Sequence, residues 1–481
     1  MKMESETTKH ILLLPYLAQG HLRPFLHLAH RLHSHTPFTI SLLTTPLNAA
    51  NLRRLNDNIE ININELPFNS CDHGLPPNTE NTDKLPLTSI ITLFCASTSL
   101  EPHLRDYLTR HHLHSPPVCI IFDICLGWAD NVARSFGSIG IGFNTSGAYG
   151  VAAYVSIWNH LPHRNVSDDE EFLVPGFPEN QKFQRNQLHR FLDTADGSDD
   201  WCRFIQLQLR LSMKCSGWLS NTVEEIEPLG FEILRNVIKI PVWGIGPTIM
   251  TSSSNDNDEA CLEWLNQCKK ESVLYICFGS QNTVTPAQIM ELAKGLEESI
   301  VSFLWVIRPP LGFDFNGEFK PEWLPEGFEE RMREKKQGKL VRKWAPQLEI
   351  LKNAAIGGFL SHCGWNSVVE SLTEAVPIIA WPLAAEQAYN SKMLVEEMGV
   401  AVELTRGLEG EVKKEKVKRV VEMVLDRSEG SCGWEMKKKA VEIGEKMRDA
   451  LKVEGDYKGS SIRAMEDFLE FIVSFRGKEV A

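Results

Sequence analysis

Short apolar segments alternate with helical patterns along almost the whole chain, and this alternation limits the fold more than any other feature. In the N-terminal half, HILLL (10–14), FTISLLT (38–44), VCIIFD (118–123) and IGIGFNT (139–145) are typical of buried strands. Between the first two lies FLHLAHRLH (25–33), where apolar residues recur as on one face of a helix. Such alternation is characteristic of parallel sheets covered by helices, so an α/β fold is predicted.

The same alternation starts again after the polar stretch MTSSSNDND (250–258). The strand candidates that follow are SVLYICFGS (272–280), SFLWVIR (302–308), KLVRKWAP (339–346), IGGFLSH (356–362) and VPIIAWP (376–382). A chain of 481 residues also exceeds the size at which single cores stop growing, about 250 to 300 residues. We therefore predict two doubly wound parallel-sheet domains, at 1–250 and 259–458, a linker at 251–258, and a C-terminal helix at 459–481 that packs back on the first domain.

Charge and cysteine usage narrow the class of protein. The formal net charge of −13 argues against a nucleic-acid partner and against binding to an anionic membrane surface. The polar start and a short apolar run interrupted by Pro15 predict neither a secretory signal nor membrane insertion, hence a cytoplasmic protein. Eleven cysteines without a C-x-x-C pair are expected to be reduced thiols, and the N-x-S/T triplets at Asn144 and Asn165 to stay unglycosylated.

Polar residues stand directly after several predicted strands, where open parallel sheets bind their ligands. Gly20 and His21 follow the first strand, at a tight turn that glycine would permit, with Pro24 in the first turn of the next helix. Asp123 closes a neighbouring strand, where an aspartate is commonly just a helix N-cap. Together His21 and Asp123 can meet across the crevice, since a carboxylate on one ring nitrogen leaves the other free to accept a proton. The pair is therefore a candidate general base.

The segment SHCGWNS ends one predicted strand and opens a helix whose first turn would contain Asn366 and Ser367. Free N–H groups at such a terminus suit a phosphate, and His362 can add a donor. A metal or redox site at His362 and Cys363 is less favoured, because further ligands are missing at workable spacing. Ser280 in FGSQ lacks the flanks of a nucleophile and suits a second phosphate loop. The sequence contains neither a P-loop nor a dinucleotide-binding fingerprint.

The segment WAPQLEILKNAAIGGFLSHCGWNSVVESLTEAVPIIAWPLAAEQ (344–387) closely resembles the signature segment of the plant family 1 UDP-sugar glycosyltransferases, without a gap. The resemblance extends to PYLAQGHLRPFLHLAHRL (15–32), to FGSQ (278–281) and to the order of strands, and so covers nearly the whole chain. It implies a GT-B fold, in which two Rossmann-like domains face one another across a cleft. The acceptor would bind mainly to the N-terminal domain and the UDP-sugar mainly to the C-terminal domain.

The resemblance also implies roles for single residues. UDP would be bound by Ser280, Trp344, Ala345, Gln347, His362, Asn366, Ser367 and Glu370. The sugar would be bound by Thr145, Trp365, Glu386 and Gln387, with Gly20 on the acceptor side. Glutamate at 386 replaces the aspartate of many members, glutamine at 387 favours glucose, and tryptophan at 365 argues against glucuronic acid. His21 and Asp123 match the catalytic base and its partner.

The expected activity is the inverting transfer of glucose from UDP-glucose to a hydroxyl of a lipophilic plant small molecule, such as a flavonoid, another phenolic or a terpenoid. A β-glucoside would result. No metal or other cofactor is expected, because polar donors at the helix terminus would stabilise the diphosphate, and a monomer is expected. Acceptor choice would lie in variable loops near residues 85–100, 147–158 and 186–200. Transfer to carbon or to an existing sugar, a nucleotide-sugar isomerase or hydrolase, and an inactive binding protein remain alternatives.

Overall fold

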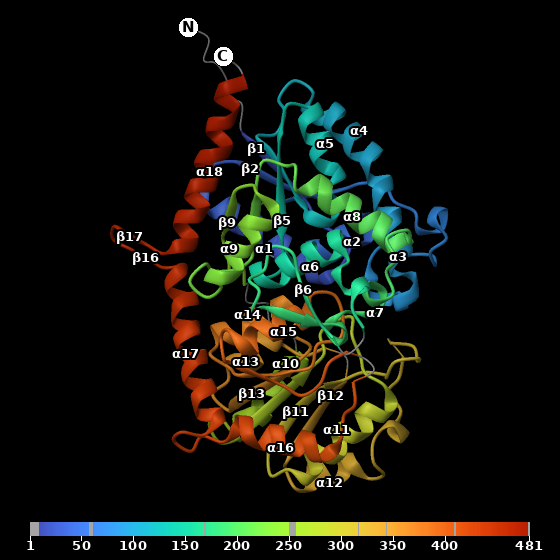
Figure 1. The fold of residues 1–481 in the computed structure, drawn as a ribbon, viewed down its shortest axis with the longest axis vertical. Helices are drawn as coiled ribbons and strands as arrows, with labels where there is room; N and C mark the ends of the chain where they lie inside the picture. Colours follow the sequence, from blue (N-terminus) through green and yellow to red (C-terminus); the bar gives the residue numbers. More distant parts are fainter. Residues whose placement is uncertain are drawn as a thin grey trace.

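Two parallel β-sheets organise the protein (Figure 1). The structure, a computed structural model, describes residues 9–56, 61–167, 170–249, 256–315, 317–342, 344–407 and 410–479. The first sheet has seven strands in the order β3 (Asn62–Glu65), β2 (Thr39–Thr44), β1 (His10–Leu14), β4 (Cys119–Asp123), β5 (Ile139–Asn144), β8 (Trp218–Ser220) and β9 (Val242–Gly244). The second has six, in the order β12 (Gly338–Arg342), β11 (Ser302–Ile307), β10 (Val273–Cys277), β13 (Ile356–Ser361), β14 (Ile378–Ala380) and β15 (Ala401–Glu403). The predicted α/β fold with two parallel-sheet domains is confirmed.

Helices cover both faces of the first sheet. Alternate residues of β1 enter two different cores: Ile11 and Leu13 point to one face, and Leu12 and Leu14 to the other. The helices are α1 (Gln19–His35), α2 (Pro46–Leu55), α3 (Ile90–Ala96), α4 (Leu100–His112), α5 (Trp128–Ser135), α6 (Ala148–His160), α7 (Arg190–Asp193), α8 (Asp200–Ser212) and α9 (Pro228–Ile238), with a hairpin of β6 (Glu171–Leu173) and β7 (Lys182–Gln184). The 3₁₀ turns of the first domain include η2 (Thr82–Lys84) and η5 (Ile124–Leu126).

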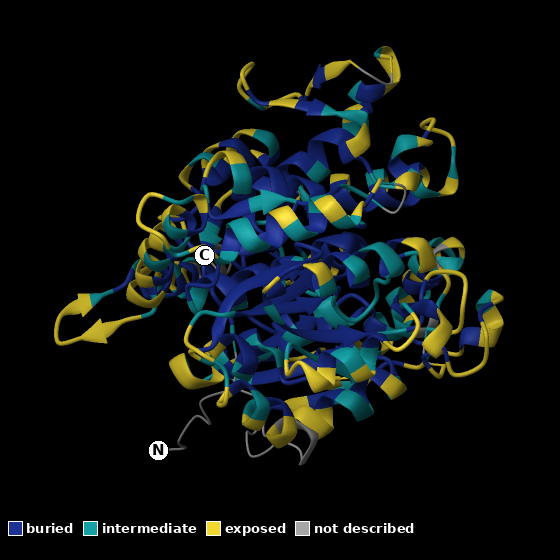
Figure 2. Ribbon diagram, turned by 90° about the horizontal axis from the view of Figure 1, so that it is seen from below, coloured by how far each residue is buried: buried dark blue, intermediate teal, exposed yellow. Residues whose placement is uncertain are grey.

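The second sheet is built in the same way. Leu274 and Ile276 of β10 enter one core, and Val273 and Tyr275 enter the core on the opposite face. Its helices are α10 (Asp256–Leu265), α11 (Pro286–Glu298), α12 (Phe328–Glu334), α13 (Gln347–Lys352), α14 (Trp365–Thr373), α15 (Gln387–Glu396), α16 (Lys414–Leu425) and α17 (Cys432–Ala450). The linker predicted at 251–258 lies largely outside the described residues, and α10 begins within that range. In Figure 2 the buried residues gather in the interior of the molecule, and exposed residues lie mainly on the outer helices and loops.

The C-terminal segment connects the two domains (Figure 1). After α17 and a small hairpin of β16 (Val453–Glu454) and β17 (Tyr457–Lys458), helix α18 (Ser460–Glu479) runs along the first domain. Its side chains Met465, Phe468 and Ile472 enter the core that contains Ile11, and the rings of Phe468 and Trp243 lie 5.6 Å apart. In the described ranges, no helix is both long and apolar enough to cross a bilayer.

Replacing Ile472 with valine tests the packing of α18. Ile472 is completely buried, so loss of one methylene should lower the free energy of unfolding by about 0.5 to 1.5 kcal/mol. Val473, the next residue of the helix, is 40% exposed, and Val473→Ala is the matched control. Thermal unfolding of both variants measures the difference. Equal melting temperatures would contradict the burial of Ile472 against the first domain.

Candidate active site

The carboxyl ends of β1 and β4 bring His21 and Asp123 together. These strands are neighbours in the sheet, and His21 lies in the first turn of α1, directly after β1. His21 Nδ1 lies 2.6 Å from Asp123 Oδ2, a distance typical of a charge-assisted hydrogen bond. The His21 side chain is 31% exposed, whereas Asp123 is 1% exposed. Because Nδ1 donates to the carboxylate, Nε2 is the ring nitrogen that can accept a proton.

The two alternative readings of Asp123, as an N-cap and as a partner of His21, are both correct. One carboxylate oxygen, Oδ1, accepts a hydrogen bond from the backbone N–H of Cys125 at 3.0 Å and so caps η5. The other oxygen, Oδ2, bonds to His21. The cap fixes the direction of the carboxylate, so Asp123 meets the imidazole without needing to change its rotamer.

The pKa of His21 is raised above its ordinary value of 6.5. Burial alone would lower this pKa, but the charge of Asp123 and its hydrogen bond raise it more, with a smaller contribution from Glu386. Thr145 Oγ1 lies 3.4 Å from His21 Nδ1, so the residue expected beside the sugar also lies beside the base. The surroundings therefore favour the imidazolium that would form when Nε2 takes a proton.

The start of α1 differs from the prediction. The helix begins at Gln19, so Gly20 has helical backbone geometry and the tight-turn explanation for this glycine is wrong. Pro24 lies inside the helix rather than in its first turn. Because proline has no N–H, the carbonyl of Gly20, four residues earlier, lacks its helical partner. Asn366 Nδ2 of the second domain donates to this carbonyl at 3.0 Å. Pro24 therefore leaves the Gly20 carbonyl free for a hydrogen bond between the domains.

On the opposite wall, β13 ends in a turn that places His362 against two glycines. A Cβ at Gly279 would lie 2.6 Å from His362 Nε2, and a Cβ at Gly364 would lie 2.4 Å from it. Burial, with a smaller effect of the nearby Arg308 charge, lowers the pKa of His362 to about 4. The ring is therefore neutral, and its buried Nδ1 has no hydrogen-bond partner within the described ranges. A phosphate oxygen would provide a partner for the imidazole.

The residues expected to bind uridine lie together beside this turn. Gln347 Nε2 donates to Glu370 Oε2 at 2.6 Å and to Ser367 Oγ at 2.9 Å. Trp344 is 48% exposed, whereas the adjacent Ala345 is buried. The half-exposed indole of Trp344 offers a stacking surface for the base of a nucleoside. The Gln347 and Glu370 side chains beside it offer polar partners. Ser280 lies at the end of β10 in the neighbouring loop, beside the turn that contains His362.

The residues expected to bind the sugar already have partners. Trp365 is 3% exposed, and its indole N–H donates to the backbone oxygen of Asn221 in the first domain at 2.7 Å. Glu386 Oε1 accepts from Ser146 Oγ at 3.0 Å, again across the domain boundary. Gln387 Oε1 accepts the backbone N–H groups of residues 383 and 384, both at 2.9 Å. Glu386 and Trp365 thus contact the first domain, whereas the oxygen of Gln387 is bound within its own loop.

An aromatic array leads away from His21 into the first domain. The Tyr16 ring lies 5.4 Å from the imidazole, and Phe94 of α3 lies 4.5 Å from Tyr16. Trp201 of α8 and Phe191 of α7 continue the array at 5.4 and 4.9 Å. Phe94 and Phe191 come from two of the regions expected to select the acceptor, but the prediction that these regions are loops is wrong: both residues lie in helices, and 147–158 forms most of the buried helix α6. Tyr16 and Trp201 lie outside those regions, although Tyr16 follows β1 directly and the strand-end rule would have found it.

A family model described as UDP-glucoronosyl and UDP-glucosyl transferase matches residues 244–429, which include the second sheet and the segment 344–387. Curated relatives match nearly the whole chain. The chain is 40% identical to UDP-glycosyltransferase 92A1 of Arabidopsis thaliana over 474 residues, which cover 96% of each protein. It is 41% identical to crocetin glucosyltransferase 3 of Crocus sativus over 442 residues, which cover 88% of this chain and 92% of the relative.

Among solved structures, UGT2 of Phytolacca americana in complex with UDP-2fluoro-glucose and pterostilbene is similar to this chain. The TM-score is 0.78 and the sequence identity 29%, and the match covers 97% of this chain and 100% of the other. The likeness therefore includes both domains.

Proposed function

Because the chain belongs to the family of plant UDP-glycosyltransferases, we propose that it transfers glucose from UDP-glucose to a hydroxyl group of a lipophilic small molecule. The observation that carries this proposal is the hydrogen bond of 2.6 Å between His21 Nδ1 and Asp123 Oδ2 beside an aromatic array. It provides a general base next to an apolar surface. Transfer would invert the configuration at the anomeric carbon and give a β-glucoside.

His21 would start the reaction as the general base. Nε2 takes the proton from the acceptor hydroxyl while its oxygen forms a bond to the anomeric carbon, and the bond from that carbon to UDP breaks. The positive charge on the imidazole is balanced by Asp123, which is buried and cannot be screened by water. The electron pair of the broken bond leaves with UDP, and the imidazolium later loses its proton to solvent.

The groups beside the expected diphosphate position can stabilise the leaving UDP. Three polar groups lie at the beginning of α14: the neutral ring of His362, the amide of Asn366 and the hydroxyl of Ser367. The first N–H groups of this helix also have no helical partner. Such donors stabilise the charge that develops on a leaving phosphate. The proposed reaction therefore uses side chains and a helix terminus rather than a metal ion.

The aromatic array supports an apolar and partly aromatic acceptor. Phe94, Trp201 and Phe191 are each partly exposed, so their rings can contact a planar aglycone beside His21. Two similar proteins support this choice: one is named crocetin glucosyltransferase 3, and the solved structure of the other contains pterostilbene. We propose flavonoids, other phenolics and terpenoids as the acceptor class.

A product screen tests this function. The purified protein is incubated with UDP-glucose and a panel of flavonoids, other phenolics and terpenoids, and the products are identified by mass spectrometry and NMR. A β-glucoside on oxygen is expected for at least one acceptor. Parallel reactions with UDP-galactose and UDP-glucuronic acid test the preference for glucose that Gln387 and Trp365 imply.

Three results would contradict the proposal in different ways. UDP release or a new sugar without any acceptor would indicate a hydrolase or an isomerase. A carbon-linked product or a glucosylated sugar would keep the family but change the acceptor atom. Stoichiometric binding of acceptors without any product would indicate a binding protein.

A further inference from the structure

Arg23, which the resemblance does not assign to the site, extends from the first domain to the uridine region of the second. It lies in α1 one turn after Gly20, whose carbonyl accepts from Asn366. Its guanidinium carbon lies over the Trp344 ring, 4.5 Å from the ring centre, which is a cation–π contact. The charge of Glu370 also acts on Arg23, so the guanidinium lies among the groups expected to bind UDP.

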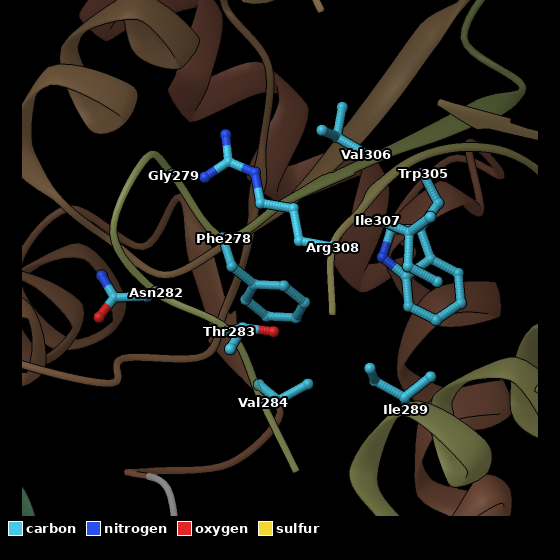
Figure 3. A pocket seen from close by; sticks show the side chains of 10 residues that line it. All are labelled: Phe278, Gly279, Asn282, Thr283, Val284, Ile289, Trp305, Val306, Ile307 and Arg308. Atoms are coloured by element: carbon cyan, nitrogen blue, oxygen red, sulfur yellow. The ribbon is translucent and has the colours of Figure 1, made fainter. Parts of the chain in front are cut away.

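A second cation lies on the other side of the same region. Arg308 directly follows β11, and its Nη1 donates to the backbone oxygen of Ser280 at 2.9 Å. Its charge helps to lower the pKa of His362, so it also lies near that ring. Figure 3 shows the Arg308 side chain beside the loop that contains Phe278 and Gly279. The hollow behind this loop offers about 10 Å³, room for at most one water molecule, so a diphosphate would have to bind on the cleft side.

The charges of both arginines act on one carboxylate of the first domain, Asp83. Asp83 belongs to η2 of the first domain. The preceding residue, Thr82, accepts a hydrogen bond from Gln281 of the second domain. Burial raises the pKa of the Asp83 carboxyl, while hydrogen bonds with Gln19 and Gln281 and the charges of Arg308 and Arg23 lower it. A partly buried carboxylate on which the charges of two arginines act is in an environment that also suits a phosphate group.

We propose that Arg23 and Arg308 bind the diphosphate of the donor, one from each domain, and that Asp83 is the counter-ion which the diphosphate replaces. The proposal rests on the proposed function, since it takes a UDP-sugar as the donor. A diphosphate has more negative charge than one carboxylate and can accept bidentate hydrogen bonds from a guanidinium. Binding of the donor would then draw the two domains together through Arg23, and the uracil would stack on Trp344 where the guanidinium now lies.

Calorimetric titration with UDP and with uridine tests this pair. Uridine has no phosphate, so an effect on the diphosphate changes the affinity for UDP alone. For Arg23→Met we expect about a tenfold loss of UDP affinity, because a charge-assisted hydrogen bond is lost, and no loss of uridine affinity, because the uracil takes the place of the guanidinium on Trp344. Arg23→Lys keeps the charge but cannot form the bidentate pair, so its affinity for UDP should lie between those of the wild type and Arg23→Met. Arg308→Met should behave like Arg23→Met, with its melting temperature measured to show that it folds.

Two further variants complete the test. Asp83→Asn removes the competing anion, so UDP affinity should rise by a few fold. Arg54→Met removes one exposed arginine from α2 in the same domain and should leave both affinities unchanged. The proposal would be overturned if Arg23→Met lost equal affinity for UDP and uridine, or lost no affinity for UDP. Weaker UDP binding by Asp83→Asn would overturn it as well. If the wild type itself fails to bind UDP, the proposed function fails before the variants are compared.

Discussion

Replacement of His21 by alanine should lower the turnover number by about 10²- to 10⁴-fold, the usual contribution of general acid–base catalysis. Without the imidazole the reaction loses its proposed base, and Asp123, which is 1% exposed, is too buried to replace it. Binding of UDP should survive, because the groups expected to contact UDP belong mainly to the second domain. Steady-state kinetics with UDP-glucose and one accepted aglycone, together with a UDP titration, measure both effects.

His33→Ala is the matched control for this variant. His33 lies in the last turn of the same helix, α1, and is exposed to solvent. Its replacement should leave turnover and UDP affinity unchanged. Added imidazole should restore part of the activity of His21→Ala, because it can enter the space of the lost ring and accept the proton. Near-normal turnover of His21→Ala would remove His21 from the mechanism.

The sequence was sufficient to predict the fold because most strands of parallel sheets are buried on both faces and therefore read as apolar runs. The runs at 10–14 and 356–361 became β1 and β13, as predicted. The strands without such a signal are short: β8, β9 and β15 have three residues each, too few for a detectable pattern. β3, with the sequence NINE, lies at the edge of its sheet, where polar residues are tolerated.

Without the family resemblance, the pattern of strands could predict only those site residues that directly follow a strand. His21 and Asp123 follow neighbouring strands, so the strand-end rule was enough to find them. Arg308 also follows a strand directly, and the same rule, applied to β11, would have found it. Asp83 lies in a 3₁₀ turn that is far in the sequence from any strand end, so the strand-end rule does not indicate it. The hydrogen bond of Trp365 to the first domain depends on how the domains face one another, which local patterns do not encode.

Replacement of Asp123 by asparagine should lower turnover by on the order of 10²-fold and change the pH dependence of the reaction. Asparagine would still cap η5 through its oxygen, but its NH₂ group would face His21 Nδ1. Nδ1 would then accept a hydrogen bond, and the ring proton would move to Nε2. The nitrogen that faces the acceptor could no longer take a proton, so the base would be in the wrong tautomer.

The pH profile separates this role of Asp123 from a purely structural one. In the wild type, the pKa of His21 is raised above 6.5, so activity should be lost as the pH falls through that raised value and the base becomes protonated. Without the Asp123 charge, burial lowers this pKa, and the acid limb of the profile should move to lower pH. Asp130→Asn is the control, since Asp130 is a buried carboxylate of the same domain that pairs with Arg134 at 2.7 Å. That variant can lose stability, but its acid limb should stay in place. If both variants have the wild-type profile, Asp123 does not set the basicity of His21, and its role is only to cap η5.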